Sequence, residues 1–210
     1  MSTLGGLSNI RSRYINGGDL EKIIHNVPAS ERLPFEIAVS TGLRIGDVVA
    51  IRLDQIDDSG DNMLIRFVAQ KTGKEGSATI PPPLAARIRR QMRSLRTSKF
   101  LFPPAKRYAK TPHLTRQTCW ARMKRAARAA GVSLDGVSPH SLRKVYAVDL
   151  RHEKGLAAVR DALQHSNDAV TRVYAYADTV LNFESDEPIR WRDLELVVDY
   201  VLERLHEKNA

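Results

Sequence analysis

The sequence predicts an α+β domain that is mainly α-helical and carries one small antiparallel β-hairpin. Apolar residues recur at helical spacing through most of the 210-residue chain. Over residues 56–82 the period changes, and β-branched and aromatic residues partly alternate around a turn rich in Gly and Lys. No apolar run is long enough to cross a membrane or to act as a signal peptide, so we expect no membrane partner.

Composition divides the chain into three parts. Residues 1–18 are polar and contain Gly, which is typical of a linker or tail. Residues 19–177 hold the periodic patterns and form the expected domain. Residues 178–210 are acidic and end in an amphipathic helix, whose apolar stripe must be covered by its own domain or by a neighbouring subunit. That stripe consists of Leu194, Val197, Val198, Val201, Leu202 and Leu205.

The net charge of +9 is unevenly distributed. Residues 76–134 contain no acid and fourteen Arg and Lys, whereas residues 178–210 contain nine acids and four bases. The first 177 residues therefore have 29 bases and 15 acids, a net charge of +14. An acid-free run of this length predicts a polyanionic partner, of which double-stranded DNA is the obvious one.

The cysteine and histidine content points away from disulfides and metals. The single Cys119 cannot form an internal disulfide, suits a reducing cytoplasm, and is interpreted as a small residue on a helix. The six histidines show no metal-ligand spacing, so we expect neither a metal nor a cofactor. We expect the protein to be located in the cytoplasm, and to be associated with the nucleoid if the source is bacterial.

Two short helices are expected first. Asp19 can cap a helix that runs through Ile24, and a second helical pattern follows Pro28. Gly42 should break this second helix. Ile45, Val48, Val49 and Leu53 then start another helix at helical spacing.

Arg44 falls at the N-terminal turn of that third helix, where free backbone N–H groups also favour an anion. Asp47, one turn further on, is positioned to hold Arg44 in place. The alternative is an ordinary surface ion pair, which contributes little to stability.

A β-hairpin follows. Residues 63–70 and 77–81 read as strands, and the turn between them places Lys71 and Lys74 at its tip. A basic hairpin tip can enter a nucleic-acid groove, and a Lys there can donate a proton. Alternatively, the turn is simply polar.

Two basic helices and a short buried segment are expected next. The chain looks helical from Pro83 to Leu95, is buried over residues 100–104, and is helical again over residues 114–130. On that last helix, Trp120 and Met123 are expected to lie in the hydrophobic core of the domain. The basic residues of this helix are expected to lie largely on the outside. The DNA-binding candidates are Arg116, Arg122 and Arg125 on this helix and Lys74 at the hairpin tip.

Residues 138–144, SPHSLRK, should begin the next helix. Ser138 is a candidate N-cap, and Pro139 suits the first helical position. His140 and Arg143 are three residues apart, so they share one helix face and can reach one small anion together. Taken alone, this pattern is common in helices that have no catalytic role.

The last part of the domain contains further candidates. Gly155 should end the preceding helix, and Leu156, Val159 and Leu163 form a short one. His165 follows at its end, and the next turn leads to Tyr174, nine residues later.

In their order along the chain, four of these segments resemble the catalytic domain of the tyrosine recombinase, or phage integrase, family. Residues 41–57 resemble its first-arginine box and residues 70–81 its hairpin-lysine segment. Residues 138–144 resemble its H-x-x-R box, and residues 163–176 the closing box with the nucleophilic Tyr. The resemblance covers roughly residues 20–177.

The resemblance implies a DNA strand-breaking and rejoining enzyme with Tyr174 as nucleophile and a 3′-phosphotyrosyl product. Arg44 and Arg143 would neutralise charge on the pentavalent transition state. Lys71 would protonate the leaving 5′ oxygen, and strand exchange would occur within a homo-tetramer on DNA. Two further residues are implied: His140 assists proton movement, and His165 hydrogen-bonds the phosphate.

Three functions remain open at this point. The favoured one is a site-specific recombinase or integrase of a mobile genetic element. A type IB topoisomerase-like enzyme shares the chemistry, and a non-catalytic DNA-binding relative would lack a catalytic group. The chain departs from the family pattern at Gln164 and Lys144, but no catalytic group is missing. The resemblance implies a helical DNA-binding domain before this one, and the first 18 residues are expected to be too few to form it, so we expect either an excised catalytic domain or a protein that naturally lacks that domain.

The choice of nucleophile rests on spacing. Tyr174 and Tyr176 are two residues apart and point in different directions on a helix, so they cannot share one attack geometry. The nine-residue spacing from His165 selects Tyr174 by resemblance. Tyr146, one turn after Arg143, is interpreted as a core or helix-face residue.

Overall fold

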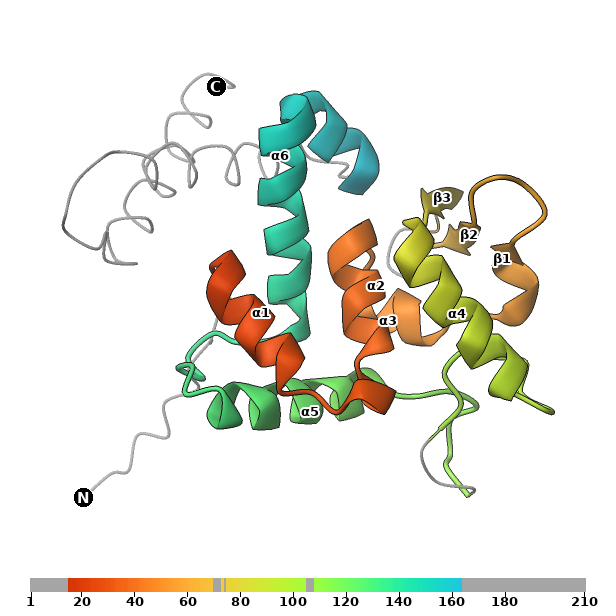
Figure 1. Ribbon diagram of the computed structural model, residues 1–210, viewed down its shortest axis with the longest axis horizontal. Helices are drawn as coiled ribbons and strands as arrows, with labels where there is room; N and C mark the ends of the chain where they lie inside the picture. Colours follow the sequence, from red (N-terminus) through yellow and green to blue (C-terminus); the bar gives the residue numbers. More distant parts are fainter. Residues whose placement is uncertain (1–14, 70–72, 74, 105–107, 164–210) are drawn as a thin grey trace, which may run out of the picture. The chain divides into compact units, whose positions relative to one another are not determined.

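A computed structural model of the chain describes residues 15–69, 73, 75–104 and 108–163. The chain divides into two compact units, Met1–Tyr146 and Ala147–Ala210. The described residues are mainly helical, with one three-stranded antiparallel sheet, as the sequence predicts (Figure 1). Within these described ranges, no helix combines the length and the apolarity needed to cross a bilayer.

Helix α1 (Gly17–His25) begins three residues earlier than expected. Its N-cap is Asn16, whose side-chain oxygen accepts the backbone N–H of Asp19 at 2.7 Å. The prediction that Asp19 caps the helix is therefore wrong. Asp19 lies in the first turn, where its carboxylate accepts a hydrogen bond from the Asn16 side chain and complements the helix dipole.

Helix α2 (Leu33–Thr41), which follows the 3₁₀ turn η1 (Ala29–Glu31), ends as predicted at Gly42. Gly42 has a φ of 67°, in the left-handed region, and its N–H donates to the Ala38 carbonyl at 3.0 Å. A Cβ built on Gly42 would lie 2.2 Å from Cδ1 of Tyr146. Gly42 therefore serves two requirements at once, the left-handed turn and the close approach of an aromatic ring.

Replacing Gly42 by Ala is expected to lower the free energy of unfolding by about 2 kcal/mol or more, because both backbone strain and the overlap with Tyr146 oppose the new methyl group. Thermal or urea unfolding measures the loss. Gly60→Ala is the matched control, since Gly60 has no positive φ and nothing within 4 Å of a built Cβ. If the two variants were equally stable, the left-handed turn and the contact with Tyr146 would not require glycine at position 42.

Helix α3 (Ile45–Val49) is shorter than the apolar pattern suggests, because the chain leaves it to pair with a distant segment. The Ile51 carbonyl accepts the Leu101 N–H at 2.9 Å, and the Leu53 N–H donates to the Lys99 carbonyl at 3.0 Å. Leu53 then begins the 3₁₀ turn η2 (Leu53–Gln55) rather than continuing a helix. The burial expected for residues 100–104 holds for Leu101 and Phe102, whereas the other three residues are only partly buried.

The sheet contains the predicted hairpin and one strand that the sequence did not suggest. Strands β2 (Leu64–Val68) and β3 (Glu75–Thr79) pair antiparallel, and β1 (Ile56–Asp57) joins the other edge of β2. In β2 the fully buried Ile65 is followed by the exposed Arg66, which is the alternation of a sheet with one solvated face. Lys71 and Lys74 lie outside the described residues.

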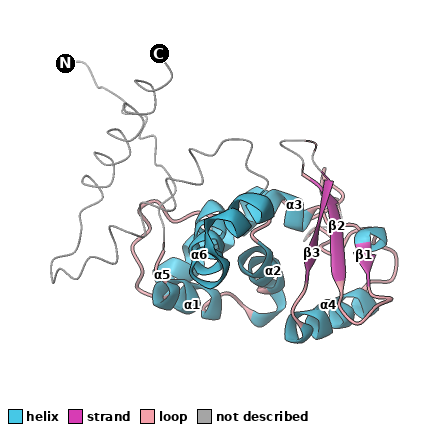
Figure 2. Ribbon diagram, turned by 90° about the horizontal axis from the view of Figure 1, so that it is seen from above, coloured by secondary structure: helices cyan, strands magenta, loops and turns pink. Residues whose placement is uncertain are grey.

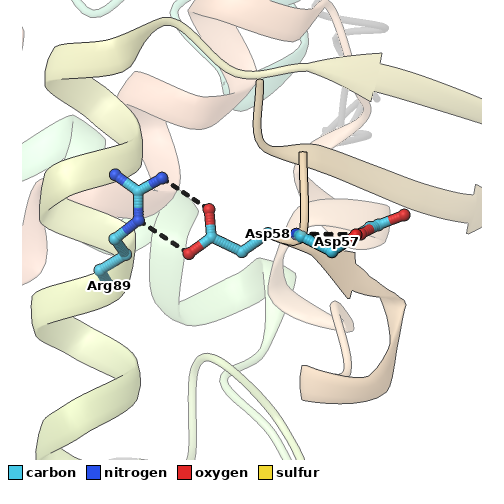
Figure 3. Close-up of polar contacts among 4 residues, drawn as sticks. Asp57, Asp58 and Arg89 are labelled. Atoms are coloured by element: carbon cyan, nitrogen blue, oxygen red, sulfur yellow. Dashed lines mark hydrogen bonds and ion pairs between the residues drawn. The ribbon is translucent and has the colours of Figure 1, made fainter. Parts of the chain in front are cut away.

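Helix α4 (Pro82–Ser94) confirms the helix expected after the proline run. Leu84, Ala85 and Ile88 are buried, and Figure 2 shows the helix beside one end of β2 and β3. The Arg89 guanidinium forms a bidentate pair with the Asp58 carboxylate, at 2.7 and 2.6 Å (Figure 3). These hydrogen bonds hold the pKa of Asp58 below its usual range. The pair ties α4 to the loop between β1 and β2.

Helix α5 (Arg116–Ala129) begins at Thr115, whose hydroxyl accepts the Thr118 N–H at 3.1 Å. Met123 is buried as expected; Cys119, expected only to be a small residue on a helix, is buried too, and this burial raises the pKa of its thiol to about 11. The expectation for Trp120 is wrong: its side chain is 45% exposed, and Lys124 Nζ lies 4.3 Å from its ring centroid. The face of α5 that packs into the core is therefore narrower than the sequence suggested, because it does not include Trp120.

Helix α6 (Pro139–Leu163) starts at the predicted proline. Gly155, with a φ of 79°, interrupts it, so the predicted break and the short helical segment beyond it are both present. The Ser138 N–H donates to the buried Ser141 hydroxyl at 3.4 Å, a weak contact at the helix start. His165, Tyr174 and the acidic segment 178–210 lie outside the described residues.

Candidate active site

A pocket of about 630 Å³ opens where the first residues of α3, α5 and α6 meet. All of its lining residues belong to the first compact unit. It brings together segments that lie nearly one hundred residues apart in the sequence. The lining residues are Arg44, Ile45, Gly46, Asp47, Arg116, Gln117, Trp120, Ser138, Pro139, His140 and Arg143.

Arg44 immediately precedes α3, in the N-cap position that the sequence predicted. Its backbone is extended, with φ −64° and ψ 139°, and its carbonyl accepts the N–H groups of Asp47 and Val48. The side chain is half-buried and makes no hydrogen bond or ion pair within the described ranges. A guanidinium held in this way at a pocket wall has its donors available to an anion.

Arg143 is positioned differently, because its guanidinium is built into the protein. The residue is only 5% exposed, and its Nη1 donates to the Gly42 carbonyl at 2.7 Å. This bond joins α6 to the turn that carries Arg44, two residues further along. A guanidinium has five N–H donors, of which this bond uses one, and Arg143 also lines the pocket.

His140 and Asp47 line the same pocket. His140 is exposed, one turn before Arg143, and Asp47 is 9% exposed on the first turn of α3. Arg44 and Asp47 line the pocket together, and the supporting role of Asp47 stays a prediction. Arg44, His140 and Arg143 lie around one pocket, as their proposed cooperation requires.

One pocket wall was only partly foreseen from the sequence. Arg116 was a DNA-binding candidate, but Gln117 and Trp120 on the same helix were not expected to line the site. The spacing of Arg116, Trp120 and Lys124 could have indicated that Trp120 is exposed. Residues at i, i+4 and i+8 share a helix face, and two charged members indicate that this face is open to solvent.

Two further DNA-binding candidates, Arg122 and Arg125, are not among the residues that line the pocket. The Arg122 guanidinium is 2.9 Å from the Glu31 carboxylate, and its side chain is only 13% exposed. The expectation that Arg122 lies largely outside is therefore wrong, because it is paired with η1. Arg125 is exposed on α5. Lys71, Lys74, His165 and Tyr174 lie outside the described residues.

The chemistry of the pocket suits a phosphodiester. Three guanidiniums and one imidazole line it against a single carboxylate, and α5 and α6 both present their N-terminal ends to it. Arg offers a planar fork of donors that matches two phosphate oxygens. Among the residues that the structure describes, no group of three or more His, Cys, Asp or Glu could hold a metal ion.

Comparison with known proteins points to one family. The sequence profile described as the phage integrase family matches residues 13–179. Tyrosine recombinase XerD of Lacticaseibacillus casei is 31% identical over 150 residues, which make up 70% of this chain and 50% of that protein. The XerD of Vibrio cholerae is 30% identical over 161 residues, 71% of this chain and 50% of the relative. The chain thus spans about half the length of these relatives.

Solved structures share the fold. The site-specific recombinase XerH bound to palindromic difH substrate, a post-cleavage complex, aligns with a TM-score of 0.66 at 20% identity, over 82% of this chain and 52% of XerH. A lambda integrase fragment, a dimer bound to a COC′ core site, has a TM-score of 0.66 at 20% identity, over 90% of this chain and 66% of that fragment. A lambda integrase tetramer bound to a Holliday junction has a TM-score of 0.64 at 21% identity, over 82% of this chain and 50% of the integrase.

Proposed function

This chain belongs to the phage integrase family, and from that premise we propose that it cleaves and rejoins DNA strands in site-specific recombination, through a 3′-phosphotyrosyl intermediate. Its relatives of about 30% identity are named tyrosine recombinases, and the chain aligns with about half the length of each. The basic residues of the first 177 positions supply the charge that a DNA substrate requires.

One observation carries the proposal: Arg44, His140 and Arg143 line the same pocket although 96 residues separate the first two. A phosphodiester that enters this pocket meets two guanidiniums, which can neutralise its non-bridging oxygens as charge develops in the transition state. Because Arg143 is held by the Gly42 carbonyl, one of these cations is pre-positioned before DNA binds.

The remaining steps are assigned by place in the family motifs, to His140 and to three residues outside the described ranges. The Tyr174 oxygen attacks phosphorus, forming a P–O bond as the bond to the 5′ oxygen breaks. Lys71 donates a proton to that leaving oxygen, and His140 takes up the phenolic proton. His165 hydrogen-bonds the phosphate. Attack of a 5′-hydroxyl on the phosphotyrosine reverses the step and reseals the strand.

Strand exchange requires more than one protomer. Lambda integrase has been solved as a dimer on a core site and as a tetramer on a Holliday junction. By the same logic, this chain would act as a homo-tetramer on double-stranded DNA. The apolar stripe of residues 194–205 is a candidate contact between subunits.

A covalent-adduct assay tests the proposed function. Nicked duplexes with randomised sequence are incubated with the protein and separated under denaturing conditions, so that only covalent complexes shift. We expect a protease-sensitive band that retains the DNA 3′ end. Transfer of the trapped strand to a second duplex would distinguish recombination from nicking and resealing alone. No adduct anywhere in the pool would contradict the proposal.

A further inference from the structure

The arginines of α4 divide into two groups with different surroundings. Arg87 pairs with the Glu36 carboxylate, and Arg89 forms the bidentate pair with Asp58 shown in Figure 3. Arg90 and Arg93 on the helix, and Arg96 just beyond its end, are exposed and make no ion pair within the described ranges. The first group holds α4 to the rest of the protein, whereas the second makes no such ion pair among the described residues. We call Arg90, Arg93 and Arg96 the α4 basic stripe.

The α4 basic stripe points away from the core. At about 100° per residue, Arg90 and Arg93 lie roughly 60° apart on the helix, and Arg93 lies about opposite the buried Leu84. Like charges three residues apart repel each other. The C-terminal end of a helix dipole partly offsets that repulsion, but it does not require three cations together. The stripe therefore suits an external polyanion.

The stripe is separate from the candidate active site. No α4 residue is among the residues that line the pocket. In both ribbon views, α2 lies between α4 and the first turns of α6, Pro139–Tyr146 (Figures 1 and 2). A partner on the stripe can therefore be bound while the pocket is occupied.

The chemistry of the surface favours nucleic acid over protein. Protein interfaces contain buried aromatic and aliphatic residues at their centre, whereas DNA interfaces are polar and strongly basic. The large hydrophobic residues exposed in the described ranges are Val68, Tyr108 and Trp120, and none of them is on α4. Arg90 and Arg93 lie roughly 4.5 Å apart along the helix axis, and Arg96 follows just beyond the helix end, which suits phosphates spaced about 3.4 Å per strand along a duplex.

We propose that the α4 basic stripe binds the phosphate backbone of a second DNA duplex, without sequence preference, while the pocket holds the first. One protomer then bridges two duplexes. The inference rests on the proposed function only in taking the pocket's ligand to be DNA.

The test compares the 210-residue protein with its variant Arg90→Gln/Arg93→Gln/Arg96→Gln. One duplex is immobilised, and retention of a second, fluorescent duplex is measured at increasing protein and salt concentrations. Three lost phosphate contacts remove about 2.7 from the slope of log affinity against log salt, so bridging should weaken roughly a hundredfold or more at 0.1 M salt. Covalent adduct formation on a single duplex should be retained, because the stripe lies outside the pocket.

A matched variant controls for net charge. Lys22→Gln/Arg128→Gln/Lys154→Gln removes the same charge from exposed positions elsewhere and should bridge within about threefold of the unaltered protein. Both variants should melt at the same temperature as the parent, since Gln is a good helix former. Stripe-dependent bridging by a protein that forms no adduct would refute the proposed function and leave this inference standing.

Three outcomes would overturn the inference. The stripe variant could bridge as well as the parent, or both variants could lose bridging equally, which would make net charge the sole cause. A synthetic peptide of residues 178–210, the acidic segment of the chain, tests the third. If the peptide binds the parent but not the stripe variant, while both proteins bridge duplexes equally well, the stripe recognises an acidic protein segment instead.

Discussion

Tyr174→Phe is expected to abolish the covalent protein–DNA adduct completely, while DNA binding changes little. The phenolic oxygen is the atom that would bond to phosphorus, and Phe removes it without altering the ring. An unperturbed phenol has a pKa near 10, so attack near neutral pH needs the positive charge that Arg44, His140 and Arg143 would supply. The nicked-duplex assay under denaturing conditions measures the loss.

Tyr176→Phe and Tyr146→Phe are the controls, and both should retain the adduct. Tyr146 packs its ring against Gly42, where a Cβ would come within 2.2 Å of Cδ1. Phe keeps that ring and so preserves the packing. Adduct in Tyr174→Phe, with a phosphotyrosyl peptide mapped to Tyr176, would instead shift the assigned register by two residues.

Arg44→Ala and Arg143→Ala should each slow cleavage by about a thousandfold or more, because fixed cations stabilise charge in phosphoryl transfer. Non-specific DNA binding should fall only slightly, since many other basic residues neutralise the backbone. Single-turnover adduct formation and duplex binding, measured side by side, separate the two effects. Cleavage near the wild-type rate in either variant would show that this arginine has another role.

The same two variants should differ in stability. Arg143→Ala removes the donor of the buried hydrogen bond to the Gly42 carbonyl, and leaving such an acceptor unsatisfied costs about 1–3 kcal/mol. Arg44 is half-buried and makes no such hydrogen bond within the described ranges, so the free energy of unfolding of Arg44→Ala should lie within about 0.5 kcal/mol of that of the wild type. Arg143→Lys keeps the charge but not the fork, and should restore cleavage only in part.

Much of this protein could be predicted from local sequence signals. Gly42 ends α2, Pro139 begins α6 and Gly155 interrupts it, because Gly tolerates a positive φ and Pro suits a first helical turn. The hairpin followed from β-branched residues around a Gly-containing turn. The order of the motifs predicted the family, which the match over residues 13–179 confirms.

Contacts between distant segments were decided only by the tertiary structure. Nothing near Arg143 indicates that it donates to Gly42, 101 residues away, and nothing near Arg122 indicates its ion pair with Glu31. The sequence also could not divide the basic residues of α4 into paired and exposed ones. Local signals act through the conformation of a few adjacent residues, whereas partners and burial depend on which surfaces the folded chain brings together.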